Sequence, residues 1–210
     1  MARILITSGP TRQYLDPVRY LTNASSGRMG AALAEVALEA GHQVVIVSGP
    51  VQIDYPHGAE IHRVVTTQEM LNRAAELFPH CNGLIGVAAP CDYQPERIAA
   101  NKLAKTGEPL VLHLIETPDI VATLGAAKRA DQWVVGFALE TEDHRFRAIG
   151  KMQRKCCDLM VLNSPSAMDS TDTQIEILAP SGDVVDTVSG TKEAAAAAIL
   201  RQIDRRLLRR

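Results

Sequence analysis

Two short apolar runs rich in β-branched residues end in the same tripeptide, Ser-Gly-Pro. They are ARILITSGP, residues 2–10, and HQVVIVSGP, residues 42–50. Each predicts a buried strand that the Gly-Pro pair terminates. Between them, apolar residues recur at helical spacing from Gly27 to Ala40, and Gly41 follows as a residue that typically ends a helix. Strand, helix and strand in this order predict a parallel sheet covered by helices.

The same alternation continues to the end of the chain. Further strands are predicted at 61–67, 83–89, 110–115, 133–139 and 158–163, a hairpin at 174–190 around residues 181–183, and helices at 68–78, 118–129, 142–155 and 191–208. We find no repeat and no linker. We therefore expect one domain, residues 1–210, with a doubly wound α/β fold: a mostly parallel, Rossmann-like sheet with helices on both faces and extra hairpin strands.

Composition excludes several classes of protein. The formal net charge of -2 predicts no general attraction to nucleic acid or to an anionic membrane. No apolar run approaches the roughly 18 residues of a membrane span, and the start of the chain lacks the pattern of a signal peptide. The four cysteines form no CxxC pair and the six histidines show no zinc-ligand spacing, so we expect reduced thiols and a cytoplasmic protein.

Residues of a polar or loop-forming kind, together with one aromatic residue, gather where the predicted strands end. They are Ser8 to Thr11, Ser48 to Pro50, Ala88 to Asp92, Phe137, Glu140 and Asn163. Because ligands bind at the carboxyl ends of strands in open α/β sheets, we expect these residues to form one rim around a ligand.

The sequence Ser25-Ser26-Gly27 begins the first predicted helix and belongs to this rim. A helix N-terminus favours an anion, serine hydroxyls add donors, and glycine lets the backbone approach a phosphate. The alternative is an ordinary serine N-cap beside a packing glycine. Neither a Walker A loop nor GxGxxG is present, and the second strand ends without the acid that NAD-binding units place there, which disfavours a dinucleotide.

The polar loop from Cys91 to Gly107 carries Asp92, Arg97, Lys102 and Lys105. A basic loop beside a phosphate site suits charge development on a phosphoryl group, although the two lysines can also be read as an ordinary solvated pair. Asp92, at a strand end, is a candidate ligand for Mg²⁺ or an acceptor of a substrate hydrogen bond.

Several segments, taken in order, resemble the phosphopantothenoylcysteine synthetase family of coenzyme A biosynthesis. They are ITSGPTRQYLDPVRYLTNASSGRMG, GVAAPCDYQP, NKLAK, TPDIVATL, VVGFALET and KCCDLMVLN. The resemblance implies ligation of L-cysteine to 4′-phosphopantothenate through an acyl-nucleotidylate, driven by a nucleoside triphosphate, CTP in most bacterial members and ATP in eukaryotic ones. It also implies Mg²⁺, a homodimer with active sites at the interface, and, because no decarboxylase residues are seen, a stand-alone synthetase without flavin.

The resemblance assigns roles to individual residues. Asn23 and Lys102 are the implied catalytic residues. The implied nucleotide-binding residues are Gly9, Ser25, Ser26, Gly27, Gly30, Lys102, Lys105, Phe137 and Asn163. The implied substrate-binding residues are Arg19, Asn23, Ala88, Ala89 and Asp92, with Arg19 reaching the substrate phosphate across the dimer interface. The apolar segment 110–115 is our candidate for part of that interface.

Two departures from the family pattern bear on this assignment. The common AAVADY reads AAPCDY here, which places Pro90 and Cys91 beside the implied substrate, and KIKK reads KLAK, which replaces one basic residue by Ala104. The alternatives are a short-chain-type NAD(P)-dependent oxidoreductase, whose GxxxGxG and YxxxK motifs are absent, and a non-catalytic nucleotide-binding module.

Overall fold

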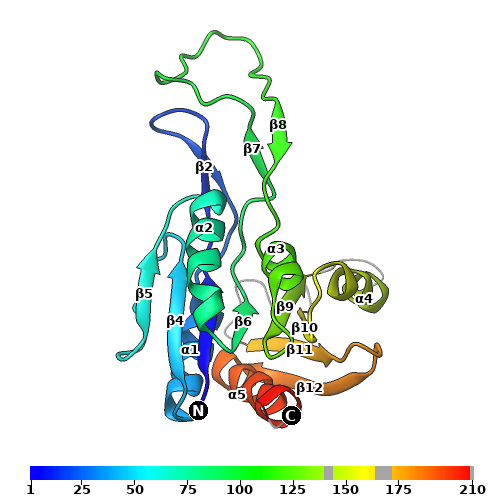
Figure 1. Ribbon diagram of the computed structural model, residues 1–210. Helices are drawn as coiled ribbons and strands as arrows, with labels where there is room; N and C mark the ends of the chain where they lie inside the picture. The colour runs from blue at the N-terminus through cyan, green and yellow to red at the C-terminus, as the bar shows by residue number, and fades with distance from the viewer. Residues whose placement is uncertain (140–143, 164–171, 209–210) are drawn as a thin grey trace.

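An eight-stranded sheet forms the centre of the protein in the computed structural model, which describes residues 1–139, 144–163 and 172–208 (Figure 1). Its order is β12-β11-β10-β9-β6-β1-β4-β5. The strands are β1 (Arg3–Ser8), β4 (Gln43–Ser48), β5 (Glu60–Arg63), β6 (Gly83–Gly86), β9 (Trp133–Leu139), β10 (Leu159–Asn163), β11 (Asp172–Leu178) and β12 (Val184–Thr191). The pairs from β5 to β10 are all parallel, and β11 and β12 add antiparallel pairs. The predicted fold class is confirmed.

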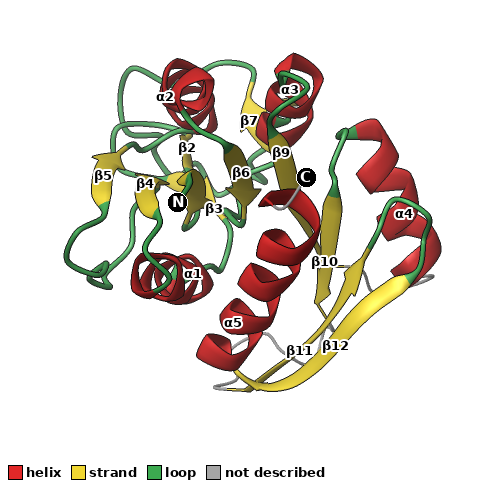
Figure 2. Ribbon diagram, turned by 60° about the horizontal axis from the view of Figure 1, so that its bottom comes forward, coloured by secondary structure: helices red, strands yellow, loops and turns green. Residues whose placement is uncertain are grey.

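Helices cover both faces of this sheet (Figure 2). They are α1 (Arg28–Glu39), α2 (Thr67–Leu77), α3 (Ile120–Ala127), α4 (His144–Arg154) and α5 (Lys192–Ile203), with a 3-10 turn η1 (Phe78–His80) and a π-helical turn η3 (Asp204–Leu208). Helices α1 and α5 pack on one face, against Ile4 and Ile6, and α2, α3 and α4 pack on the other, against Leu5. Successive residues of β1 thus serve opposite cores, which is why this strand is apolar without interruption.

Two small antiparallel ladders project from the carboxyl edge of the sheet (Figure 1). One pairs β2 (Arg12–Tyr14) with β3 (Tyr20–Thr22), and the other pairs β7 (Tyr93–Pro95) with β8 (Leu114–Glu116). We call residues 12–22 and 93–116 together the arm. The predicted strand 110–115 is therefore shorter than expected and shifted, because the chain only begins to pair at Leu114. The β2–β3 hairpin was not predicted.

Other boundaries differ from the sequence prediction for local reasons. The strand predicted at 61–67 ends at Arg63, because Thr66 and Glu69 form a capping box that starts α2. The strand predicted at 83–89 ends at Gly86, and the chain then turns so that the Ala89 N–H donates to the Gly9 carbonyl at 2.9 Å. The helix predicted at 191–208 is α-helical only to Ile203.

The cysteines of the protein are all free thiols, as predicted. Cys81, Cys91 and Cys157 are buried and Cys156 is exposed. Burial raises the pKa of the Cys157 thiol to about 12, so this side chain stays neutral at physiological pH. No helix in the described part of the chain combines the length and apolar character needed to cross a bilayer.

Candidate functional site

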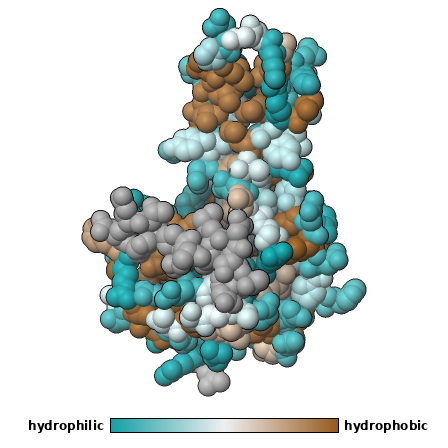
Figure 3. Space-filling model, turned by 180° about the vertical axis from the view of Figure 1, so that it is seen from behind, coloured by the Kyte–Doolittle hydropathy of each residue, from teal (hydrophilic) through white to brown (hydrophobic). Residues whose placement is uncertain are grey.

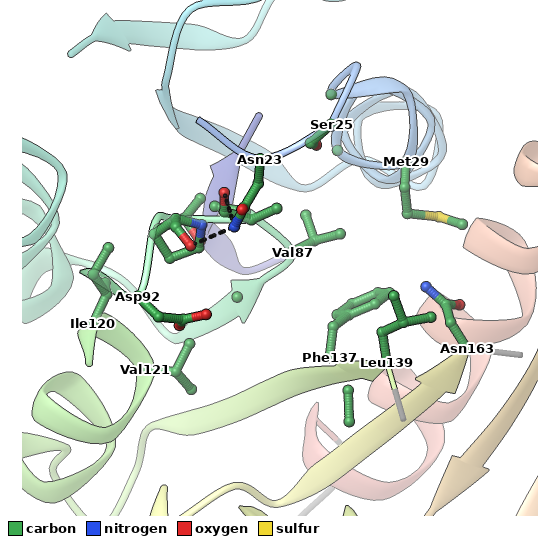
Figure 4. Close-up of a pocket in the computed structure, with 18 of the residues that line it drawn as sticks. Asn23, Ser25, Met29, Val87, Asp92, Ile120, Val121, Phe137, Leu139 and Asn163 are labelled. Atoms are coloured by element: carbon green, nitrogen blue, oxygen red, sulfur yellow. Dashed lines mark hydrogen bonds between the residues drawn. The ribbon is translucent and has the colours of Figure 1, made fainter. Parts of the chain in front are cut away.

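A cavity of about 950 Å³ opens at the carboxyl ends of the central strands, where the chain order of the sheet reverses between β1 and β6. This is the position at which open α/β sheets bind ligands. Ten of the predicted site residues line it: Asn23, Ser25, Ser26, Gly27, Gly30, Ala88, Ala89, Asp92, Phe137 and Asn163. Figure 4 shows Asn23 and Asp92 toward one end of the cavity and Phe137 with Asn163 toward the other.

The N-terminus of α1 faces this cavity without a side-chain cap. Gly27 occupies the N-cap position with φ 77°, in the left-handed region that favours glycine, and no side chain accepts a hydrogen bond there. The serine N-cap alternative is therefore wrong. The first turn of α1 carries no acidic residue. Its backbone N–H groups and the positive end of the helix dipole thus remain for an anionic ligand.

Helix α1 lies unusually close to β1 at its start. A Cβ atom added to Gly30 would lie 2.1 Å from the Ser8 Oγ and 2.6 Å from the Ser8 Cβ, and Ser8 is fully buried. The Ser8 hydroxyl donates to the Gly27 carbonyl at 3.3 Å. Glycine at position 30 therefore fixes how closely the helix N-terminus approaches the end of β1.

We expect Gly30→Ala to destabilise the protein by about 1–3 kcal/mol, because the new methyl group overlaps Ser8 in a closely packed region. The measurement is the midpoint of thermal unfolding by circular dichroism. Gly150→Ala in α4 is the matched control, since the added Cβ there meets only the Arg154 Nη1 at 3.5 Å and alanine favours the helix. Equal midpoints for the two variants would contradict the close-packing argument.

Asn23 connects the loop after β3 to the loop after β6. Its Nδ2 donates to the Pro90 carbonyl at 2.8 Å and lies 3.4 Å from the Ala89 carbonyl (Figure 4). Cys91, which follows Pro90, is held in place by two hydrogen bonds. Its N–H donates to the Thr11 Oγ1 at 2.8 Å, and its carbonyl accepts from the Thr117 Oγ1 at 2.6 Å. Of the two residues that depart from the family pattern, Pro90 thus lines the cavity, and Cys91 is fixed behind it by hydrogen bonds.

The cavity is also lined by residues that sequence reasoning missed. Three of them are lysines: Lys151 near the end of α4, Lys155 directly after α4, and Lys192 at the start of α5. The Lys155 ammonium lies 2.9 Å from the Asp119 carboxylate. The Asn163 Oδ1 is buried and has no hydrogen-bond partner among the described residues. The spacing of Lys151 and Lys155, one helical turn apart after a core strand, was the available signal.

Four predicted site residues do not line this cavity. Gly9 directly follows β1 and lies against Val51. Arg19, Lys102 and Lys105 lie on the arm, beyond the carboxyl edge of the sheet (Figure 1). Among the other residues expected at the rim, Ser48 is buried and hydrogen-bonded to the Tyr55 hydroxyl at 2.8 Å, so it does not face a ligand. Glu140 lies outside the described residues.

The acidic residues of the cavity are Asp92, Glu116 and Asp119. No cluster of three or more potential metal ligands occurs within residues 1–139, 144–163 and 172–208. Any cation bound here would therefore take its remaining ligands from water or from a bound substrate.

Comparisons with known proteins assign a family. The model of the DNA/pantothenate metabolism flavoprotein C-terminal domain matches residues 1–207. The chain is 39% identical over 207 residues to the coenzyme A biosynthesis bifunctional protein CoaBC of Vibrio parahaemolyticus, covering 95% of this chain and 51% of that protein. It thus spans about half the length of such relatives.

Solved structures agree on the fold. The crystal structure of the C-terminal domain of a CoaBC protein superposes with a TM-score of 0.84 at 34% identity, covering 99% of this chain and 96% of that one. A Cab2 mutant, described as a complex with phosphopantothenate-cysteine, superposes with a TM-score of 0.81 at 17% identity over 99% of this chain and 86% of that one. At that identity the second likeness concerns the fold alone.

Proposed function

The chain belongs to the family of the DNA/pantothenate metabolism flavoprotein C-terminal domain, and from this premise we propose that it is a phosphopantothenate–cysteine ligase. In this proposal it joins L-cysteine to 4′-phosphopantothenate in coenzyme A biosynthesis, at the expense of a nucleoside triphosphate. The observation that carries the proposal is one cavity that is lined by an uncapped helix N-terminus, by Asn23 and by three lysines.

The proposed reaction needs two kinds of anion in this cavity. The N-terminus of α1 suits the triphosphate, because its N–H groups and dipole stabilise phosphate oxygens. Lys151, Lys155 and Lys192 also line the cavity and would add positive charge for the negative charge that leaves with pyrophosphate. Phe137 and Asn163 are the proposed contacts of the nucleoside, since the buried Asn163 Oδ1 is an acceptor that a base amino group can satisfy.

The proposed reaction has two steps, activation of the carboxylate and formation of the amide. A carboxylate oxygen of phosphopantothenate attacks the α-phosphorus, the bond to the bridging oxygen breaks, and pyrophosphate leaves. The cysteine amine then attacks the acyl carbon, the nucleoside monophosphate leaves from that carbon, and the amine loses a proton. Activation is needed because a free carboxylate offers no adequate leaving group.

Asn23 and Lys102 are the proposed catalytic residues. Asn23 holds the carbonyl groups of residues 89–90 and lies at the cavity wall where the carboxylate would react. Lys102 would supply a cation to the α-phosphate, with Lys105 in a lesser role. Ala88 and Ala89 would lie along the pantothenate chain.

Magnesium fits this site through Asp92. The Asp92 side chain projects into the cavity (Figure 4), and a single carboxylate together with phosphate oxygens and water is a typical magnesium environment. The bound ion would supply charge neutralisation of the polyphosphate.

The test of the function is pyrophosphate release with phosphopantothenate, L-cysteine and each of CTP, ATP, GTP and UTP in turn. We expect release that requires phosphopantothenate and is fastest with CTP, and amide product that requires cysteine. Nucleotide binding without pyrophosphate release in the presence of both co-substrates would instead support a non-catalytic nucleotide-binding module. The oxidoreductase alternative receives no support from the family match.

We further propose that two copies of the chain associate through the arm. Apolar side chains gather on its surface (Figure 3), and the exposed large ones are Val18, Tyr20, Tyr93, Ile98, Leu110, Val111, Leu112, Leu114 and Ile115. An apolar surface of this extent on a projecting element is typical of an interface. The family resemblance supports a second copy of the chain as the partner that covers this surface, and the association would bring Arg19 of one copy toward the cavity of the other.

We also propose that the protein is located in the cytoplasm.

We expect Val111→Asp to convert the dimer into a monomer and to remove most ligase activity, because it places a carboxylate in the proposed apolar interface. Val111 is 74% exposed in the single chain. Light scattering after size-exclusion chromatography measures the mass. Phe146→Asp is the matched control, since Phe146 is 82% exposed but lies on α4, away from the arm. An unchanged mass for Val111→Asp would refute an interface at this position.

A further inference from the structure

Asp16 is a fully buried carboxylate in the turn between β2 and β3, outside the main sheet. Its Oδ1 accepts the N–H groups of Val18 and Arg19, both at 2.8 Å. Its Oδ2 accepts the Arg19 Nε at 2.9 Å and Nη2 at 2.6 Å, and also the Leu103 N–H at 3.1 Å. One oxygen therefore shapes the turn, and the other faces Arg19 and a distant part of the chain.

That distant part is the loop that carries the two lysines. The Leu103 N–H belongs to the peptide bond after Lys102, and the Leu103 carbonyl accepts the Arg19 Nη2 at 2.6 Å. From Ala100 to Glu116, Leu103 is the one residue that is not exposed. Both backbone groups of Leu103 are thus held by the Asp16–Arg19 pair in a segment that is otherwise open to solvent.

The charge of Asp16 is maintained despite its burial. Burial raises the pKa of this carboxyl. The hydrogen bonds from the N–H groups of Val18 and Leu103 and from the Arg19 guanidinium lower the pKa by more, so that it lies well below its usual value. The carboxylate is consequently ionised at any pH at which the enzyme would be assayed. A buried charge that accepts this many donors is costly to replace, which indicates that its contacts matter.

We propose that Asp16 is a positioning residue, which fastens Arg19 to the Lys102–Leu103 peptide so that the arm presents both cations to the substrates as one unit. The hydrogen bonds from the Arg19 side chain to Asp16 and Leu103 use its Nε and Nη2 and leave out Nη1. It is the nitrogen left to meet an anion. The positioning role rests on the proposed function, whereas the fastening itself does not.

The test uses Asp16→Asn in the full-length protein. An asparagine keeps an oxygen toward the N–H groups of Val18 and Arg19, so the turn is retained. Its Nδ2 then points donors at the donors of Leu103 and Arg19, which releases the loop. Asp131→Asn is the matched control, because Asp131 is an exposed carboxylate paired with Arg129 and distant from the arm.

The first readout is limited trypsin digestion followed by mass spectrometry. One trypsin site on the loop is the Lys102–Leu103 peptide bond, whose N–H donates a hydrogen bond to Asp16. The Lys105–Thr106 bond is a second trypsin site on the same loop and serves as the internal reference. We expect Asp16→Asn to raise the ratio of cleavage after Lys102 to cleavage after Lys105 about tenfold, because a charge-assisted hydrogen bond is lost. An unchanged ratio would overturn the proposal.

The second readout is steady-state kinetics. We expect Asp16→Asn to lower kcat and to raise the KM for phosphopantothenate more than the KM for the nucleotide, because the nucleotide keeps its proposed contacts with α1 while Lys102 is released. Asp16→Glu, which keeps the charge, should recover part of the activity. A raised cleavage ratio with unchanged kinetic constants would overturn the positioning role. An inactive wild-type protein would refute the proposed function, and the cleavage ratio would still decide whether Asp16 holds the loop.

Discussion

The variant Asn23→Asp should release pyrophosphate about 10²- to 10³-fold more slowly than the wild type, while its affinity for the nucleotide stays within about threefold. This is the loss of about 2.7–4 kcal/mol that follows removal of one preorganised donor in comparable sites. A hydrogen bond of Asn23 gives a second reason to expect this loss. The Asn23 Nδ2 donates to the Pro90 carbonyl at 2.8 Å, so an aspartate would oppose one acceptor with another.

The change therefore acts on two parts of the site. The carboxylate repels the Pro90 carbonyl, which disturbs the wall formed by residues 88–92, and it also faces the carboxylate that must attack phosphorus. Pyrophosphate release and isothermal titration with a nucleotide measure the two effects separately. Asn72→Asp is the control, since Asn72 lies exposed on α2 and undergoes the same chemical change. Wild-type turnover in Asn23→Asp would make Asn23 a turn former only.

A mixture of two inactive variants provides the second test with a large expected effect. Arg19→Ala and Asn23→Asp should each be nearly inactive as homodimers. After subunit exchange the mixture should regain about a quarter of wild-type activity, given random pairing and independent sites. A heterodimer would then contain one intact site, with Asn23 from one copy and Arg19 from the other. No recovery after confirmed exchange would place Arg19 within the site of its own chain.

The hydrogen bonds between Arg19 and Leu103 add a control to this experiment. If Arg19 and Lys102 act as one unit, a mixture of Arg19→Ala with Lys102→Gln should stay inactive, because neither arm in the heterodimer carries both cations. Recovery in this second mixture would mean that the two cations reach different sites. The pair of mixtures thus separates the question of which copy supplies the arm from the question of whether the arm is one unit.

Much of the fold was predictable because it depends on local patterns. The runs at 2–8 and 42–48 and the periodic segment 27–40 contain their own end signals, and the parallel order followed from the alternation of elements. The boundary at Thr66 was missed although its capping-box partner, Glu69, is visible in the sequence. The short hairpin at 12–22 has three-residue strands, which are too brief to show a periodic pattern.

The candidate site was predictable where residues follow a core strand or begin a helix, as Asn23, Gly27 and Phe137 do. It was not predictable where tertiary packing supplies the residue. Lys192 enters the cavity because α5 packs beside α1, and Asp16 matters because of a partner 87 residues away in the chain. Contacts of this kind have no local signature in a single sequence.

The order of the strands also bears on how the chain is synthesised. Among the strands of this sheet, β1 is synthesised before the others but lies in the middle, where it pairs with β4 and later with β6. The cavity takes residues from Thr7 near the beginning to Lys192 near the end. We therefore expect a nascent chain to build the β5-β4-β1-β6 part of the sheet early, yet to gain affinity for nucleotide only when α5 has emerged and docked. A nucleotide would then bind only those chains in which α5 has docked, and binding would shift this folding step toward completion.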